Sequence, residues 1–165
     1  PHQGDFTAEE ARTACEKFNE WGKKLADAGL HFAYHPHGYE FRPYQDGTVF
    51  DLMVSLTKPE YANFELDVFW AYDAGADPVK LMRKYPNRFP LLHLKDMDKS
   101  VKVPNTTGHE SPENDVALGL GQVDMAGIVR EGQTIGVKHY YIEDESSRSE
   151  QQIPQSVKYL KSLGN

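Results

Sequence analysis

Short, nearly uninterrupted apolar runs alternate with amphipathic helical segments along this chain, and this alternation restricts the possible folds more than any other feature. Runs at 30–34, 63–69, 89–94 and 137–142 are each long enough for one buried strand. A strand that is apolar along its whole length has both faces covered, and the helices between successive parallel strands provide that cover. The order, one helix followed by four strand–helix units, predicts an α/β fold of parallel strands with outer helices.

The helical segments carry recognisable boundary signals. Thr7 and Glu10 form a capping box in front of a helix predicted over 8–28, where apolar residues recur at helical spacing. Asp77-Pro78 places an N-cap and a proline at the start of a second helix, which ends before Pro86. Shorter or later helices are predicted over 50–55, from Asp124 to about 135, and over 149–163 with a start near Pro154. A long polar loop is predicted over 97–123.

The composition limits the class of protein. The 165 residues, 39% apolar and 12% aromatic, suffice for the core of one domain. The formal net charge of −7 argues against a nucleic-acid partner.

We expect no membrane partner, since no apolar run is long enough to span a bilayer. No signal peptide is visible, and both a cytoplasmic and a periplasmic location stay open. A single cysteine, Cys15, excludes an intrachain disulfide framework. Gly119-Leu120-Gly121 lacks the third glycine of a dinucleotide fingerprint and predicts no nucleotide site.

The four predicted strands each end in a side chain that can bind a metal ion or transfer a proton: His35, Asp67, His93 and Glu143. The C-terminal ends of parallel strands meet at one rim of an α/β structure, where binding sites form. Each residue alone also has a structural explanation. A histidine at a strand end is commonly a hydrogen-bonded structural residue, and Asp67 can form a buried salt bridge with Lys95. Taken together, the four side chains predict one divalent-metal site.

The ligand types indicate which ion and which chemistry this site supports. Two carboxylates with one or two imidazoles suit Mn²⁺, Co²⁺, Zn²⁺ or Mg²⁺ better than a soft metal. Such an ion can bind both oxygens of a hydroxy-ketone and stabilise an enediolate as a proton leaves the neighbouring carbon. Glu40, Glu143 or a neighbouring carboxylate is the candidate base for that proton.

Two further residues near these strand ends have a functional and a structural interpretation. Lys95 lies two residues after His93, on the same face of the strand, and can neutralise a developing oxyanion or pair with Asp96 or Asp67. Trp70 can form an apolar wall for a sugar ring or pack in the core. The residues themselves leave these alternatives open.

Five segments of the chain resemble, in order, the sugar phosphate isomerase/epimerase family, the xylose isomerase-like TIM barrels. They are AYHPHGYEF at 33–41, ELDVFW at 65–70, HLKDM at 93–97, GLGQVD at 119–124 and YIEDE at 141–145. The resemblance implies one divalent metal held at strand ends, typically by Glu, Asp, His and Glu. Asp67, His93 and Glu143 match the last three ligands. His35 occupies the position of the first glutamate, with His37 or Glu40 as alternatives for that ligand.

The resemblance also implies an activity. Its members are expected to act as metal-dependent isomerases or epimerases on a sugar or a close derivative, through an enediolate. The alternatives are a lyase or dehydratase acting on a keto-sugar or inositol-type substrate, and a non-catalytic domain that binds metal or carbohydrate. His2, which resembles the end of the preceding barrel strand, is expected to contact the substrate together with His37 and Trp70.

The length of the chain differs from that of a whole barrel. A TIM barrel has eight strands in about 250 residues, whereas this chain has 165. The resemblance therefore implies that 1–165 is the C-terminal half of a barrel, with strands five to eight only. Because four strands leave two open edges, we expect either self-association or a missing N-terminal half that closes the barrel.

Overall fold

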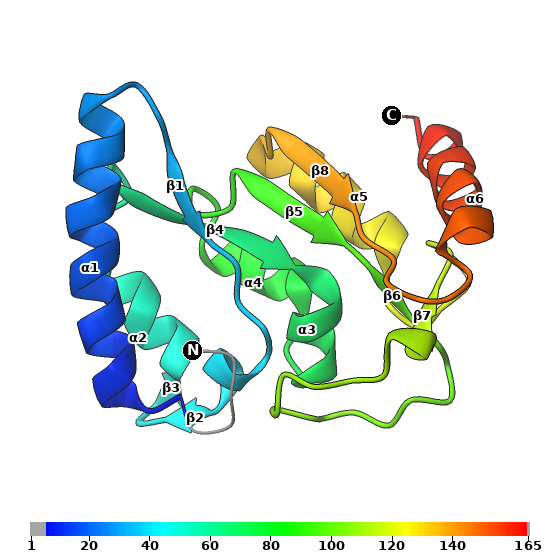
Figure 1. Cartoon of the computed structure of the whole chain (residues 1–165), viewed down its shortest axis with the longest axis horizontal. Helices are drawn as coiled ribbons and strands as arrows, with labels where there is room; N and C mark the ends of the chain where they lie inside the picture. The colour runs from blue at the N-terminus through cyan, green and yellow to red at the C-terminus, as the bar shows by residue number, and fades with distance from the viewer. Residues whose placement is uncertain (1–5, 165) are drawn as a thin grey trace.

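The computed structural model describes residues 6–164 and contains a parallel sheet of four strands (Figure 1). The strands are β1 (Phe32–Tyr34), β4 (Ala62–Asp67), β5 (Leu91–Leu94) and β8 (His139–Ile142). Their order in the sheet, β1-β4-β5-β8, is their order in the chain, and each neighbouring pair is parallel. The predicted α/β fold with parallel strands is confirmed. Within the described residues, β1 and β8 each have one neighbour and form the sheet edges.

One face of the sheet is covered by helices and forms the core. Phe64 and Leu66 of β4 and Leu92 and Leu94 of β5 are at most 1% exposed on this face. The covering helices are α1 (Ala8–Asp27), α2 (Val49–Leu56), α4 (Pro78–Lys84) and α5 (Met125–Ile135). The last helix, α6 (Ser149–Ser162), lies at the far side of the sheet beside the segment 115–118 (Figure 1). No helix in 6–164 combines the length and apolarity needed to cross a bilayer.

The helix starts predicted at Thr7, Asp77 and Asp124 are confirmed, whereas the last helix begins at Ser149, before the predicted start near Pro154. Thr7 and Glu10 form the capping box of α1, and Asp77 and Asp124 are the N-caps of α4 and α5. Helix α2 begins with a second capping box, in which the Thr48 hydroxyl accepts from the backbone N–H of Asp51 at 3.1 Å. These side chains satisfy backbone donors that a helix start leaves without partners.

The prediction of a strand over 63–69 was wrong at its end. Strand β4 stops at Asp67, and Val68 begins a short helix, α3 (Val68–Asp73). The change occurs because the Asp67 carboxylate accepts the backbone N–H of Trp70 at 3.0 Å and caps the helix. Nearly all of α3 is buried, so its sequence shows no polar face and reads like a continuation of the apolar strand.

The loop predicted over 97–123 is organised by a buried aspartate. It contains the antiparallel pair β6 (Asp96–Met97) and β7 (Asp115–Val116) and the short 3₁₀ helix η2 (Pro112–Asn114). The Asp96 carboxylate accepts the backbone N–H groups of Gly119 at 2.9 Å, Gly121 at 3.0 Å and Val123 at 3.1 Å. The backbone N–H groups of the glycine pair thus bind the chain's own carboxylate.

A small hairpin follows the segment that carries His35 and His37. The 3₁₀ helix η1 (Tyr39–Phe41) leads into β2 (Pro43–Tyr44) and β3 (Gly47–Thr48). On the sheet face opposite the helices, the parallel register places Asp67, His93 and Tyr141 side by side. This face is partly open, and Tyr141 is 45% exposed.

Candidate metal centre

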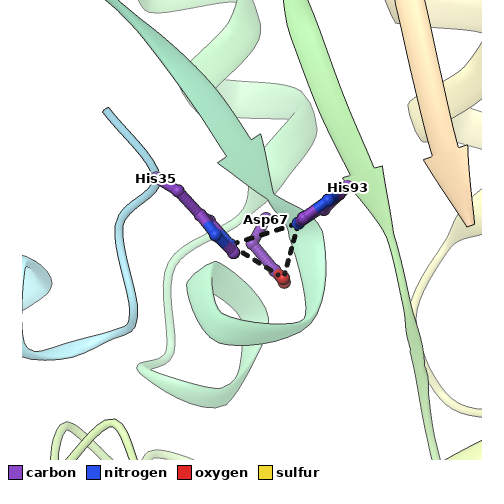
Figure 2. Close-up of side chains that lie close together, drawn as sticks. All are labelled: His35, Asp67 and His93. Atoms are coloured by element: carbon purple, nitrogen blue, oxygen red, sulfur yellow. Dashed lines mark hydrogen bonds and ion pairs between the residues drawn. The ribbon is translucent and has the colours of Figure 1, made fainter. Parts of the chain in front are cut away.

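Three of the predicted ligands meet at the C-terminal end of the sheet. His35 directly follows β1, Asp67 ends β4, and His93 lies in β5. One ligand atom from each side chain lies within 4.8 Å of the other two. His35 Nε2 is 3.1 Å from Asp67 Oδ2 and 3.4 Å from His93 Nδ1, and His93 Nδ1 is 3.8 Å from Asp67 Oδ2. Figure 2 shows both imidazoles directed toward the Asp67 carboxylate.

Asp67 contacts both the two histidines and the backbone at the start of α3. Its side chain is 0% exposed, and its two oxygens have separate partners. Oδ1 accepts the N–H of Trp70 at the start of α3, whereas Oδ2 faces the two imidazoles. Within the described part of the chain Asp67 pairs with no lysine, so the alternative of a salt bridge to Lys95 is wrong. A buried carboxylate oxygen surrounded by two imidazoles suits a cation.

The protonation of His35 reflects the same negative surroundings. Burial by itself lowers its pKa, but the hydrogen bond to Asp67 and the charges of Asp67, Glu65 and Glu143 outweigh burial, and the net pKa is raised. A metal ion and this proton would compete for the same nitrogen. Two nitrogens and one buried oxygen therefore fit a divalent ion, and His35, Asp67 and His93 form a possible site for one.

The fourth predicted ligand, Glu143, lies beside this group without joining it. It directly follows β8, and its N–H donates to the Leu94 carbonyl at 3.1 Å. Its Oε2 is 3.6 Å from His93 Nδ1 and 4.0 Å from Lys95 Nζ. With 31% of its side chain exposed, Glu143 can reach a molecule bound over the three-residue group.

Lys95 places a buried positive charge next to Glu143. Its side chain is 2% exposed, and Nζ lies 2.6 Å from Glu145 Oε2 and 3.4 Å from Asp115 Oδ2. Burial lowers the pKa of Lys95, but the hydrogen bond to Glu145 and the charges of Asp115 and Glu143 outweigh it and raise the pKa overall. The predicted pairing with Asp96 or Asp67 was wrong, because Asp96 is engaged by backbone N–H groups and Asp67 by imidazoles.

Asp115 and Glu145 are members of the site's surroundings that the sequence did not indicate. Asp115 lies in β7, within the long loop, and its Oδ2 accepts the N–H of Glu145 at 2.8 Å. Burial raises the pKa of Asp115 to about 6, although the hydrogen bond from the Glu145 backbone N–H and the positive charge of Lys95 both lower it. The only available signal was that YIEDE carries three acidic residues in succession at a strand end.

Glu40 supports the histidine segment. It is 0% exposed, its Oε1 accepts the Tyr34 hydroxyl at 2.5 Å, and its Oε2 accepts the backbone N–H of His37 at 2.9 Å. Burial raises the pKa of Glu40. These contacts fix the turn that carries His35 and His37, and they favour a supporting role over that of a base.

The predicted substrate-binding residues have different positions. The His37 ring lies 4.5 Å from the His35 ring and 6.2 Å from the Trp70 ring, between centroids. Trp70 is 9% exposed, and its ring packs against Phe69, with Lys95 Nζ 5.8 Å from its centroid. Core packing therefore accounts for most of the Trp70 surface. His2 lies outside the described residues.

Comparison with known proteins agrees with this architecture. Two sugar phosphate isomerase/epimerase structures from Parabacteroides distasonis match 95% of the chain with TM-scores of 0.74 and 0.73, at 26% and 30% sequence identity. The chain covers 55% and 54% of those two chains. A curated relative, inosose dehydratase 2 of Bacillus cereus, is 28% identical over 96 residues, or 58% of this chain and 32% of the relative.

The chain thus spans about half the length of these solved structures, and the match covers about a third of the curated relative. The correspondence to strands five to eight of a barrel stays a prediction. The sequence pattern of one family extends over residues 1–163, nearly the whole chain. That match and the parallel sheet with its ligands at the strand ends lead to one conclusion: the chain belongs to the xylose isomerase-like TIM barrel family.

Proposed function

We propose that this chain forms the metal-binding part of an isomerase or epimerase that acts on a small sugar or sugar derivative through an enediolate. The observation that carries the proposal is the convergence of His35, Asp67 and His93 within 4.8 Å, next to the buried ammonium group of Lys95. A cation site and a fixed positive charge side by side are suited to stabilising negative charge on two neighbouring substrate oxygens.

The residues that would hold the ion are His35, Asp67 and His93. Glu143, outside this group with Oε2 3.6 Å from His93 Nδ1, would add one carboxylate oxygen to the ion and keep the other for the substrate. When bound there, Mn²⁺, Co²⁺, Zn²⁺ or Mg²⁺ supplies Lewis-acid polarisation of a substrate carbonyl. Asp67 contributes its negative charge from a rigid position, because its other oxygen caps α3.

The remaining chemistry belongs to Glu143 and Lys95. The Glu143 carboxylate is the most exposed of the three carboxylates that lie within 4.0 Å of His93, and it is the candidate base that removes a proton from carbon and returns it. The Lys95 ammonium retains its proton because three carboxylates surround it. It therefore stabilises an oxyanion by charge and hydrogen bonding without itself acting as the base.

A dehydratase is the second candidate, favoured by the similarity to inosose dehydratase. Elimination begins with the same proton removal and then requires an acid to protonate the departing hydroxyl group. Glu143 is the candidate acid as well, because it carries a proton once it has taken one from carbon, and Lys95 keeps its own proton. A domain that only binds metal or carbohydrate is the third candidate.

We also propose that a second set of strands completes the site. The support is the half-length match to the solved structures and the exposed face around Tyr141. The added strands would come from a preceding segment or from a second copy of the chain. Light scattering of the purified chain distinguishes the two, since only the second requires a dimer.

Metal content is the first test of the proposed function. The wild-type chain is expected to bind about one Mn²⁺, Co²⁺ or Zn²⁺ per site, and Asp67→Asn to bind it at least about 100-fold more weakly because a charged ligand is lost. Asp46→Asn, an exposed aspartate in the hairpin turn, is the matched control. Unchanged metal affinity in Asp67→Asn would contradict the ligand assignment.

Solvent-proton exchange then tests the chemistry. The metal-loaded protein is incubated in D₂O with a panel of ketoses and inososes, and NMR follows deuterium at the carbon next to the carbonyl. Epimers or aldoses indicate an isomerase or epimerase, and unsaturated products indicate a dehydratase. Binding of these compounds without deuterium incorporation would favour the non-catalytic domain.

A further inference from the structure

The most unusual polar group outside the candidate metal centre is the carboxylate of Asp73. Asp73 ends α3, the helix that begins after Asp67. Its side chain is 0% exposed, and neither carboxylate oxygen has a hydrogen-bond partner within the described chain. A buried charge without partners is strongly unfavourable, so such a group needs either a proton or a cation.

A second carboxylate, Glu110, lies close by in the loop that covers α3. The N–H of Asn105 donates to the Asp73 backbone carbonyl at 2.6 Å, and the Asn105 side-chain amide donates to Glu110 Oε1 at 2.8 Å. Asn114 donates to Glu110 Oε2 at 2.7 Å. Burial, reinforced by the negative charge of Glu110, raises the pKa of Asp73 to about 7. No lysine or arginine forms an ion pair with either carboxylate among residues 6–164.

We propose that Asp73 and Glu110 bind a hard divalent cation, Ca²⁺ or Mg²⁺, which fastens the loop 98–111 to the end of α3. The donors are oxygens alone, which are the ligands these ions prefer. Each Glu110 oxygen accepts one amide hydrogen and keeps a second lone pair for an ion. Because the Asp73 oxygens are closed to solvent, the occupant is small and enters when the loop lifts.

A proton is the competing occupant, and it satisfies the site less well. Protonation removes the charge of Asp73 but serves only one of its two oxygens and leaves the charge of Glu110 in place. A cation instead uses both Asp73 oxygens and reduces the repulsion between Asp73 and Glu110.

The proposed Asp73–Glu110 site differs in ligands and position from the candidate metal centre formed by His35, Asp67 and His93, but the loop 98–111 contacts both. Gly108 lies in this loop with φ of 70°, and a Cβ added to it would lie 2.8 Å from the His37 carbonyl oxygen. The loop therefore packs directly on the segment that carries His35 and His37. Fastening the loop at Asp73 would hold one wall of the candidate metal centre in place.

Limited proteolysis of the loop tests this proposal. Lys99 and Lys102 are exposed loop residues at which trypsin can cut once the loop opens. The chelator-treated chain is digested with Ca²⁺ or Mg²⁺ added. At a concentration 100 times Kd, the open population and the cleavage rate at these lysines are expected to fall about 100-fold.

Two variants and two controls identify the responsible ligands. Asp73→Asn and Glu110→Gln are expected to lose the protection. Asp46→Asn controls for the loss of one surface carboxylate and keeps it. His93→Ala, which removes a ligand of the other site, also keeps it. Circular dichroism of Asp73→Asn establishes that the variant is folded before its cleavage is compared.

Three outcomes would overturn the proposal. One is cleavage that neither cation slows. Another is protection that depends on lowering the pH and not on the cation, which would identify a proton as the occupant. The third is protection that disappears in His93→Ala, which would place the ion at the candidate metal centre.

Discussion

Replacement of Lys95 by methionine removes one buried charge while keeping a long unbranched side chain. The ammonium group of Lys95 is enclosed by Glu145, Asp115 and Glu143. Glu145 is 57% exposed, so water can solvate it when Lys95 is lost. Asp115 is 2% exposed and keeps one hydrogen bond, from the Glu145 N–H. The cost of Lys95→Met therefore falls mainly on Asp115.

The magnitude follows from leaving Asp115 ionised without a cation. Breaking a buried ion pair by removing one partner costs about 3–5 kcal/mol. In the wild type the pKa of Asp115 is already raised from 3.8 to about 6. The folded protein thus binds this proton more tightly than the unfolded chain does, and the free energy of unfolding falls as the pH rises through that interval, by about 3 kcal/mol in total.

Lys95→Met raises the folded-state pKa of Asp115 further, so its destabilisation depends on pH. We expect the loss in unfolding free energy to be about 3–5 kcal/mol at pH 7.5. At pH 5 the loss is expected to be less than half as large, because Asp115 is then protonated in the folded variant. Urea unfolding of both proteins at the two pH values measures the difference.

The double variant Lys95→Met/Asp115→Asn provides the control. Once Asp115 is neutral, loss of the ammonium group leaves no buried charge alone, and most of the penalty of Lys95→Met is expected to disappear. An equal penalty at pH 5 and pH 7.5, or an equal penalty with Asp115→Asn in the background, would refute the reasoning. Either result would mean that Lys95 acts through packing on Phe69 and Trp70.

Two further predictions concern the scaffold. A Cβ at Gly121 would lie 2.1 Å from Asp96 Oδ1, so Gly121→Ala is expected to lower the unfolding free energy by roughly 1–3 kcal/mol. Thermal unfolding measures this, and a loss no larger than that of the exposed neighbour variant Leu120→Ala would count against the Asp96 loop contacts. Burial raises the pKa of Cys15 to about 11 from 9.0, so at pH 8 a thiol reagent is expected to label it on the order of 100-fold more slowly in the folded chain than in urea. Equal labelling rates would contradict its burial.

The sequence predicted those parts of the fold that depend on local signals. The helices α1, α4 and α5 begin directly after Thr7, Asp77 and Asp124 because a side-chain oxygen at each of these positions caps the backbone. Helix α3 was not predicted, since a helix buried on all sides has no amphipathic period. Its start depends on the same aspartate that was assigned to the metal site.

The candidate site was predictable where it depends on topology and not where it depends on loops. Parallel strands bring their C-terminal ends together, so the positions of His35, Asp67 and His93 followed from the strand order. The partners of Lys95 could not be predicted from the strand order. Asp115 reaches it from a loop without periodicity, and its position is set by long-range contacts such as the N–H of Glu145.

Asp67 explains why a metal ligand and a fold boundary coincide in this chain. A strand that turns directly into a buried helix needs an N-cap at the turn, and an aspartate provides one with a single oxygen. The other oxygen then remains at the strand end. It cannot rotate away while the first oxygen caps the helix, and no backbone N–H of the described residues donates to it. The parallel register pairs Asp67 with His93, and His35 reaches the same oxygen from the segment that follows β1. The ligand geometry is therefore preorganised by the start of α3. Serine, a good N-cap without a carboxylate, separates the two roles, since Asp67→Ser should keep α3 and lose the cation site.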